Sequence, residues 1–89
     1  MTGKLVKAAG RFSETTIDTE TVVMDLDSGD FFSLTGTAAA VWQRIDGTRS
    51  REALLAELVI EYGQAPEEIA ADVDAVLTQL FAAGLVADS

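Results

Sequence analysis

The apolar residues of this 89-residue chain change their spacing once, at Thr35-Gly36-Thr37. Before that point they tend to recur at every second position, which is the period of a β-strand. After it they recur at every third or fourth position, which is the period of an α-helix. A chain with its strands first and its helices second must cover one face of the sheet with the helices. We therefore expect an α+β fold.

Three strands are expected ahead of this change. Residues 12–18 are rich in Thr and predict an edge strand, and residues 21–27 place three apolar side chains on one face: Val22, Met24 and Leu26. Segment 27–30 has the chemistry of a turn, because its glycine accepts a positive φ, and residues 31–34 return as a third strand. The prediction is a three-stranded antiparallel β-meander.

Three helices are expected after the change. The first carries Trp42, the lone tryptophan, which we expect to be a core residue. The second begins after Ser50, a suitable N-cap, and ends at Gly63. The third spans residues 66–83 and begins with a proline, which suits the first helical position; its apolar stripe is Ile69, Val73, Val76, Leu77, Leu80 and Phe81. Meander and helices together predict a layout like that of a winged helix-turn-helix domain.

The whole chain, residues 1–89, is expected to form a single domain. A chain of this length buries only about 60–65% of the surface that it exposes when unfolded, so the core is small. Residues 1–11 show no clear period, and both a flexible arm and a weak first strand remain open. Residues 85–87 are expected to form a terminal extended piece.

Composition argues against catalysis. The chain has no Cys and no His, which removes the thiol nucleophile, the commonest general base and the commonest metal ligand. The acidic turn at residues 25–30 does not match a calcium loop, since a third ligand before the glycine and a closing Glu are missing. We predict that the protein is not an enzyme and has no metal or other cofactor.

Charge argues against nucleic acid and membrane partners. Fifteen acidic and six basic residues give a net charge of −9, and the third predicted helix carries four acids and no Lys or Arg: Glu67, Glu68, Asp72 and Asp74. The amino terminus lacks the apolar run of a signal peptide, and no stretch has the apolar length needed to span a membrane. A soluble, cytoplasmic protein is expected.

The pair Phe31-Phe32 is the most informative apolar feature. Consecutive residues of a strand point to opposite faces, so one ring enters the core and the other is left outside unless something covers it. An exposed aromatic ring on an edge strand favours the addition of a peptide as a further strand. The alternative is that the third helix covers both rings and leaves no groove.

Residues 21–86 resemble the PqqD-like family, small peptide-binding proteins also described as RiPP precursor recognition elements. Weak motifs carry the resemblance by their order and spacing: Val23-Met24-Asp25-Leu26-Asp27-Ser28-Gly29, Phe32-Ser33-Leu34, Thr37-Ala38-Ala39-Ala40-Val41-Trp42, Ile45-Asp46-Gly47-Thr48, Leu54-Leu55-Ala56-Glu57-Leu58 with Tyr62, Asp72-Val73, and Leu80-Phe81-Ala82-Ala83-Gly84-Leu85-Val86. The resemblance implies a non-catalytic protein that binds the leader segment of a ribosomally made precursor peptide and presents it to a modifying enzyme. Thr35 stands where many members have Asn, which leaves the choice of pathway open.

The resemblance also implies where the leader binds. It would add as an antiparallel strand beside the third strand, with contacts from Asp30, Phe31, Phe32, Ser33 and Leu34. The opposite wall would come from the third helix, with Asp72, Val73, Val76, Leu77, Gln79 and Leu80 as candidates. Among these, Asp72, Val76 and Gln79 share one helical face and form the favoured set.

The implied partners are the leader and a modifying enzyme, such as a radical SAM enzyme, a leader peptidase or a cyclase, in RiPP or quinone-cofactor biosynthesis. Two alternatives remain: a DNA-binding winged-helix protein, and an adaptor that binds a folded protein through the same apolar edge. The first is disfavoured because all six basic residues lie outside the third helix. The second is compatible with leader binding.

Overall fold

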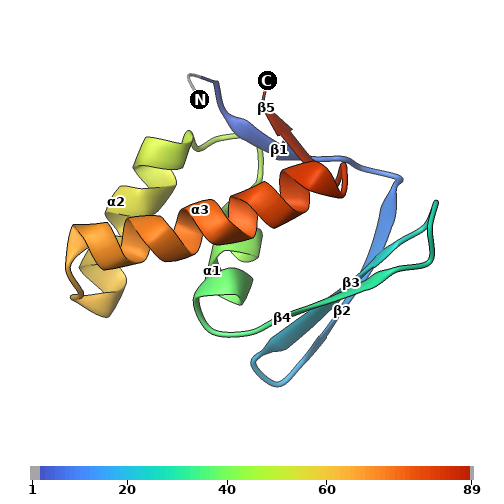
Figure 1. Ribbon diagram of the computed structural model, residues 1–89, viewed down its shortest axis with the longest axis horizontal. Helices are drawn as coiled ribbons and strands as arrows, with labels where there is room; N and C mark the ends of the chain where they lie inside the picture. Colours follow the sequence, from blue (N-terminus) through green and yellow to red (C-terminus); the bar gives the residue numbers. More distant parts are fainter. Residues whose placement is uncertain (1–2, 89) are drawn as a thin grey trace.

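Three helices lie to one side of a three-stranded sheet in the computed structural model, which describes residues 3–88 (Figure 1). The sheet is an antiparallel meander in the order β2-β3-β4, formed by β2 (Phe12–Ile17), β3 (Glu20–Asp25) and β4 (Phe31–Leu34). The helices follow in the chain as α1 (Thr37–Arg44), α2 (Arg51–Tyr62) and α3 (Pro66–Ala82). The predicted meander followed by three helices is confirmed.

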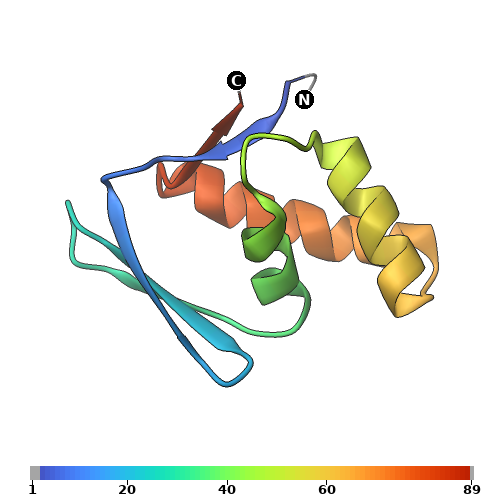
Figure 2. The same ribbon diagram turned by 180° about the vertical axis from the view of Figure 1, so that it is seen from behind.

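The two ends of the described chain form a second, two-stranded sheet. Strand β1 (Leu5–Lys7) pairs antiparallel with β5 (Val86–Asp88), and Figures 1 and 2 both show the two strands side by side. Leu5 is fully buried, and its backbone N–H donates to the Arg49 carbonyl over 2.8 Å. Of the two possibilities left open for residues 1–11, a strand is therefore observed at residues 5–7. Residues 1 and 2 of that segment lie outside the described residues.

Strand β3 turns a different set of side chains to the core from the one that its apolar pattern suggests. Its buried residues are Thr21, Val23 and Asp25, so Val22 and Met24 share the outer face, and Leu26 lies beyond the strand with 51% of its surface exposed. The buried Asp25 is satisfied locally, because its Oδ1 accepts a hydrogen bond from the Asp27 N–H over 2.9 Å.

Local chemistry sets the beginning and end of the helices. Gly36, with φ 57° and ψ −127°, makes the junction from β4 to α1 in a backbone region that favours glycine. The Ser50 hydroxyl accepts from the Ala53 N–H over 3.2 Å, as an N-cap does, and Gly63 ends α2 in the left-handed conformation. The predicted start of α3 at Pro66 is confirmed.

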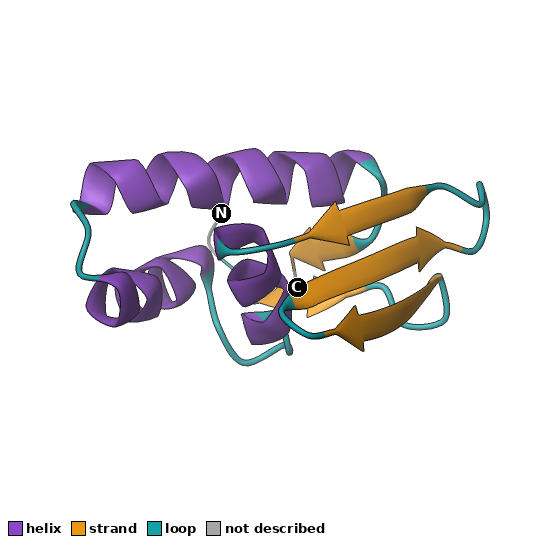
Figure 3. Cartoon of the chain, turned by 90° about the horizontal axis from the view of Figure 1, so that it is seen from below, coloured by secondary structure: helices purple, strands orange, loops and turns teal. Residues whose placement is uncertain are grey.

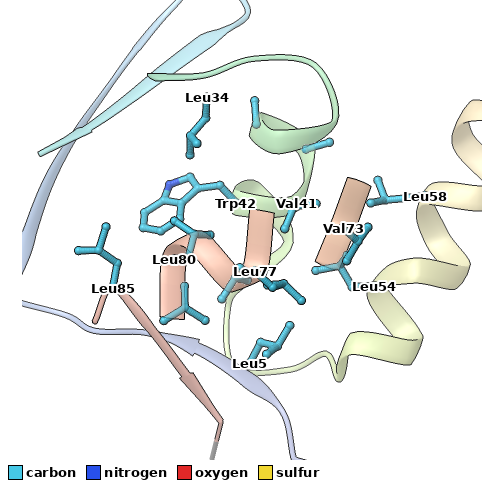
Figure 4. Packing of buried hydrophobic residues seen from close by; sticks show 14 of the residues in the cluster. Leu5, Leu34, Val41, Trp42, Leu54, Leu58, Val73, Leu77, Leu80 and Leu85 are labelled. Atoms are coloured by element: carbon cyan, nitrogen blue, oxygen red, sulfur yellow. The ribbon is translucent and has the colours of Figure 1, made fainter. Parts of the chain in front are cut away.

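The core joins both halves of the molecule around Trp42. This side chain is fully buried, as predicted, and the Phe12 ring meets it edge to face with centroids 5.1 Å apart. Figure 4 shows Trp42 inside the apolar cluster, in the region where Leu34 of β4 and Leu80 of α3 also lie. The sheet and α3 are thus packed into one core, which fixes the position of β4 relative to α3.

Candidate functional site

The outer edge of β4 carries free backbone hydrogen-bonding groups. The β3–β4 register pairs Val23 with Phe32, and next to this ladder the Asp25 N–H donates to the Asp30 carbonyl over 2.9 Å. Because inward-bonded and outward-pointing residues alternate in an antiparallel pair, Phe32 bonds to β3 and its two neighbours, Phe31 and Ser33, direct their N–H and C=O groups outward. Among residues 3–88, no backbone hydrogen bond outside the sheet engages these two residues.

The side chains of β4 divide between two environments. Phe31 points away from the core with 69% of its surface exposed, whereas Phe32 is partly buried and packs against the core. Of the two alternatives left open by the sequence, one ring packs against the core and the other stays outside, so α3 does not cover both. Ser33 is exposed, and its hydroxyl donates to the carboxylate of Glu20, while Leu34 is buried.

The six residues considered on α3 also divide. Val73, Leu77 and Leu80 are buried in the core, so their side chains do not reach the surface. The other three side chains reach the surface. Asp72 and Gln79 are exposed, and Val76 is partly buried against the core. Spacings of three and four residues put this trio on one flank of the helix.

An ion pair identifies the flank of α3 that faces α2. Arg51, at the start of α2, donates from Nε to Oδ1 of Asp74 over 2.7 Å and from Nη2 to Oδ2 over 2.9 Å. Residues two apart lie on nearly opposite sides of an α-helix, so Asp72 is turned away from α2. Figure 3 shows that β4 is the strand of the sheet on the side of α3, and β2 is the strand farthest from it. The open edge of β4 is therefore the sheet edge that lies nearer to α3.

The arginines near α2 are already paired with acids. The three arginines there, Arg44, Arg49 and Arg51, make ion pairs with Glu61, Glu57 and Asp74 at 2.6 to 2.7 Å. Hydrogen bonding to Arg51 lowers the pKa of the Asp74 carboxyl below its ordinary value. Since α3 carries no basic residue of its own, this pairing argues further against phosphate binding.

A separate hollow of about 390 Å³ is lined by no residue of β4. It sits between the turn that joins β2 to β3, α1 and the end of α2, and its lining is Asp18, Thr19, Gly36, Ala39, Ala40, Gln43, Arg44, Glu61 and Tyr62. None of the residues predicted to bind a peptide lines it. Within residues 3–88, no group of three or more His, Cys, Asp or Glu side chains could hold a metal ion, and no helix has the length and apolar character to cross a membrane.

Sequence reasoning missed the neighbours of Phe31 on the outer face of the sheet. In the β3–β4 register Met24 lies directly opposite Phe31, and Val22 lies opposite Ser33. Both β3 side chains are half-buried. The turn at residues 27–30 could have given this register, because it fixes which residues of the two flanking strands face each other.

Comparison with known proteins gives one family and two similar structures. The model of the family "Coenzyme PQQ synthesis protein D (PqqD)" matches residues 20–86, and no curated protein matches the chain. A structure described as "Lasso peptide synthetase B1 complexed with the leader peptide" is 25% identical, with a TM-score of 0.79 over 94% of this chain and 98% of the other. A second, "TbiB1 in Complex with the TbiA(beta) Leader Peptide", is 21% identical with the same TM-score and shares the fold over 91% of this chain and 94% of the other. The family match covers most of the described residues, and the chain belongs to the PqqD family.

Proposed function

We propose that this protein binds the leader segment of a ribosomally synthesised precursor peptide by strand addition to β4 and presents it to a modifying enzyme. The observation that carries the proposal is the open backbone edge at Phe31 and Ser33, next to α3. The similarity to two proteins whose structures are described as leader-peptide complexes supports it.

Strand addition accounts for both affinity and register. An antiparallel guest would exchange hydrogen bonds with the N–H and C=O groups of Phe31 and Ser33. Its side chains opposite Phe32 and Leu34 would point to the face that packs toward the helices, where Phe32 and Val76 are only partly buried. Apolar leader side chains suit these positions. Ordering a flexible leader costs about 2–5 kcal/mol of the gross interaction, so each apolar anchor matters.

We place the peptide-binding residues on both elements. Asp30 to Leu34 provide the strand, and Asp72, Val76 and Gln79 provide the accessible part of the wall. The exposed acids Asp30 and Asp72 would favour a leader with Lys or Arg near the site over an acidic one. The buried side chains of Val73, Leu77 and Leu80 would support the wall from behind.

The role is one of binding and not of catalysis. The chain would hold the leader in the cytoplasm while a separate enzyme acts on the precursor. A radical SAM enzyme, a leader peptidase and a cyclase are the candidate classes. The absence of His and Cys from the sequence is consistent with a binding role for this chain and catalysis by a separate enzyme.

Proline substitution tests strand addition at the backbone. In Ser33→Pro the ring replaces an outward N–H and leaves the inward bonds of Phe32 and Leu34 to β3 in place, and proline is tolerated at such edge positions. Ser33→Ala controls for the lost hydroxyl, which contacts Glu20. Thr16→Pro is the matched control, because the same alternation directs the N–H of Thr16 outward from β2, the opposite edge of the sheet.

The measurement is titration of a fluorescent peptide that spans the leader of the precursor encoded with this protein. We expect Ser33→Pro to weaken binding about tenfold or more, the effect of losing about 1.4 kcal/mol, and the two controls to bind nearly as wild type. Wild-type affinity in a folded Ser33→Pro variant would contradict strand addition to β4.

A further inference from the structure

Three apolar side chains lie together on the face of the sheet that points away from the helices. We call Val22, Met24 and Phe31 the outer-face patch. Met24 is directly opposite Phe31 across β3 and β4, and Val22 is two residues from Met24 on the same face. Phe31 is 69% exposed, and the other two are half-buried. Figure 3 looks onto this face, and no helix lies in front of the strands.

Packing of the core does not require apolar side chains in the outer-face patch. The core of β3 is made by the opposite face, where Val23 is fully buried. The outer positions of β3 could be polar, as they usually are when one face of an antiparallel sheet meets water. Contiguous apolar side chains on an exposed face are typical of an interaction surface.

The surroundings of the patch are acidic. Residues 12–34, which form the whole sheet and its turns, include six acids and no Lys or Arg. Asp27 and Asp30 follow the end of β3 that holds Met24, and Asp18 and Glu20 lie at its other end. Asp27 pairs with Arg11 at 2.9 Å, and among residues 3–88 no other ion pair is found at this end of the sheet. The rim is therefore predominantly negative.

The negative charge around the outer-face patch determines which kind of partner can bind there. A second copy of the chain would bring another acidic rim and another net charge of −9 against the first, and like charges across an interface oppose association. A partner with an apolar centre and a rim of Lys and Arg complements both features of the surface.

We infer that the outer-face patch docks the modifying enzyme through an apolar face with a basic rim, and that a leader on β4 lies inside the same interface. The inference rests on the proposed function. A strand added to β4 extends the sheet, and its side chains opposite Phe31 and Ser33 would stand on the outer face beside the patch. The enzyme would then contact the domain and the leader together. Leader and enzyme would each raise the affinity of the domain for the other by the same factor.

The double variant Val22→Thr, Met24→Gln tests the inference. Both changes keep side-chain size, and neither residue lies on the β4 edge, so leader binding is left intact. Ile60→Gln is the matched control, because Ile60 is an exposed apolar residue (83%) on α2, away from the sheet. The probes are the fluorescent leader peptide and the purified modifying enzyme encoded with this protein.

We expect the double variant to bind the leader as wild type does and the enzyme about tenfold or more weakly, as loss of a central apolar contact does. Ile60→Gln should bind both as wild type does, and high salt should slow association with the enzyme. Unchanged enzyme affinity in the folded double variant would overturn the inference, as would a patch-dependent homodimer in sedimentation. Failure of wild type to bind the leader would instead count against the proposed function.

Discussion

The indole Nε1 of Trp42 donates a hydrogen bond to Oε2 of Glu14 over 2.6 Å, which ties α1 to β2. The Trp42 side chain is fully buried, and Lys7 Nζ lies 4.3 Å from the centroid of its ring. Burial lowers the pKa of Lys7, and the nearby Glu14 carboxylate opposes this effect. One acid thus satisfies the indole and holds the sheet against the helices, which keeps the edge of β4 in place beside α3.

Replacing this acid should destabilise the fold. Glu14→Ala leaves the indole N–H without its acceptor, and we expect a loss of about 1–3 kcal/mol in the free energy of unfolding. Glu14→Gln keeps an acceptor and should lose less. Urea unfolding followed by the fluorescence of the lone tryptophan measures both; equal stability of Glu14→Ala and wild type would show that the bond is not stabilising.

The Arg51–Asp74 pair should contribute modestly to the free energy of unfolding, and only at a pH where Asp74 is ionised. The folded-state pKa of Asp74 is lowered, so its contribution is fully present above the unfolded value, about 3.9, and is lost as the pH falls through the folded-state pKa. The Asp74 side chain is 52% exposed, and solvent screening limits the effect to about 0.2–1 kcal/mol. Asp74→Asn should therefore lower stability at neutral pH and converge with wild type in acid.

Asp72→Asn is the control for that comparison, since no ion pair is found for Asp72 among residues 3–88. Its unfolding free energy at neutral pH should stay close to that of wild type. A deficit in Asp74→Asn that persists unchanged at low pH would mean that packing, and not charge, is responsible.

The order of elements could be predicted because its signals are local. The change of period at residues 35–37, the cap at Ser50 and the stop at Gly63 all act within a few residues of chain. The opposite faces of Phe31 and Phe32 follow from strand geometry alone. These features depend on no contact between distant segments.

The other features of the fold and the site depend on contacts between segments that are far apart in the sequence. Pairing of β1 with β5 joins residues 5–7 to 86–88, and three residues on each side carry no readable period. The sequence also does not show which face of β3 enters the core, because Val22 and Met24 are as apolar as Val23. The buried face includes Asp25, whose carboxylate is satisfied by a turn amide that the alternating pattern does not reveal. Helical spacing alone singled out Asp72, Val76 and Gln79 on α3, but the burial of Val73, Leu77 and Leu80 is seen only in the packed helix.

The amino-terminal strand should stabilise the domain. Leu5 is fully buried in the core cluster, and Leu5→Ala should cost about 2–5 kcal/mol of unfolding free energy. Ile60→Ala, at a residue that is 83% exposed, should change stability little. Thermal unfolding provides the comparison, and a Leu5→Ala variant as stable as wild type would mean that the amino-terminal strand is dispensable.

The accessible flank of α3 should be needed for leader binding. Val76→Glu places a charge beside partly buried apolar surface on the flank turned away from α2, and we expect a loss of leader affinity of about tenfold. Ala75→Glu adds the same charge at the neighbouring exposed position and should bind nearly as wild type. Equal losses in both variants would indicate a general charge effect in place of a local contact.

Residue-level hydrogen exchange along β4 tests the central claim most directly. In the free protein the inward N–H groups of Phe32 and Leu34 should exchange slowly, and the outward N–H groups of Phe31 and Ser33 quickly. Saturating leader peptide should slow exchange at Phe31 and Ser33. Amides at these two positions that are already protected in the free monomer, or that bound leader leaves unchanged, would contradict strand addition at this edge.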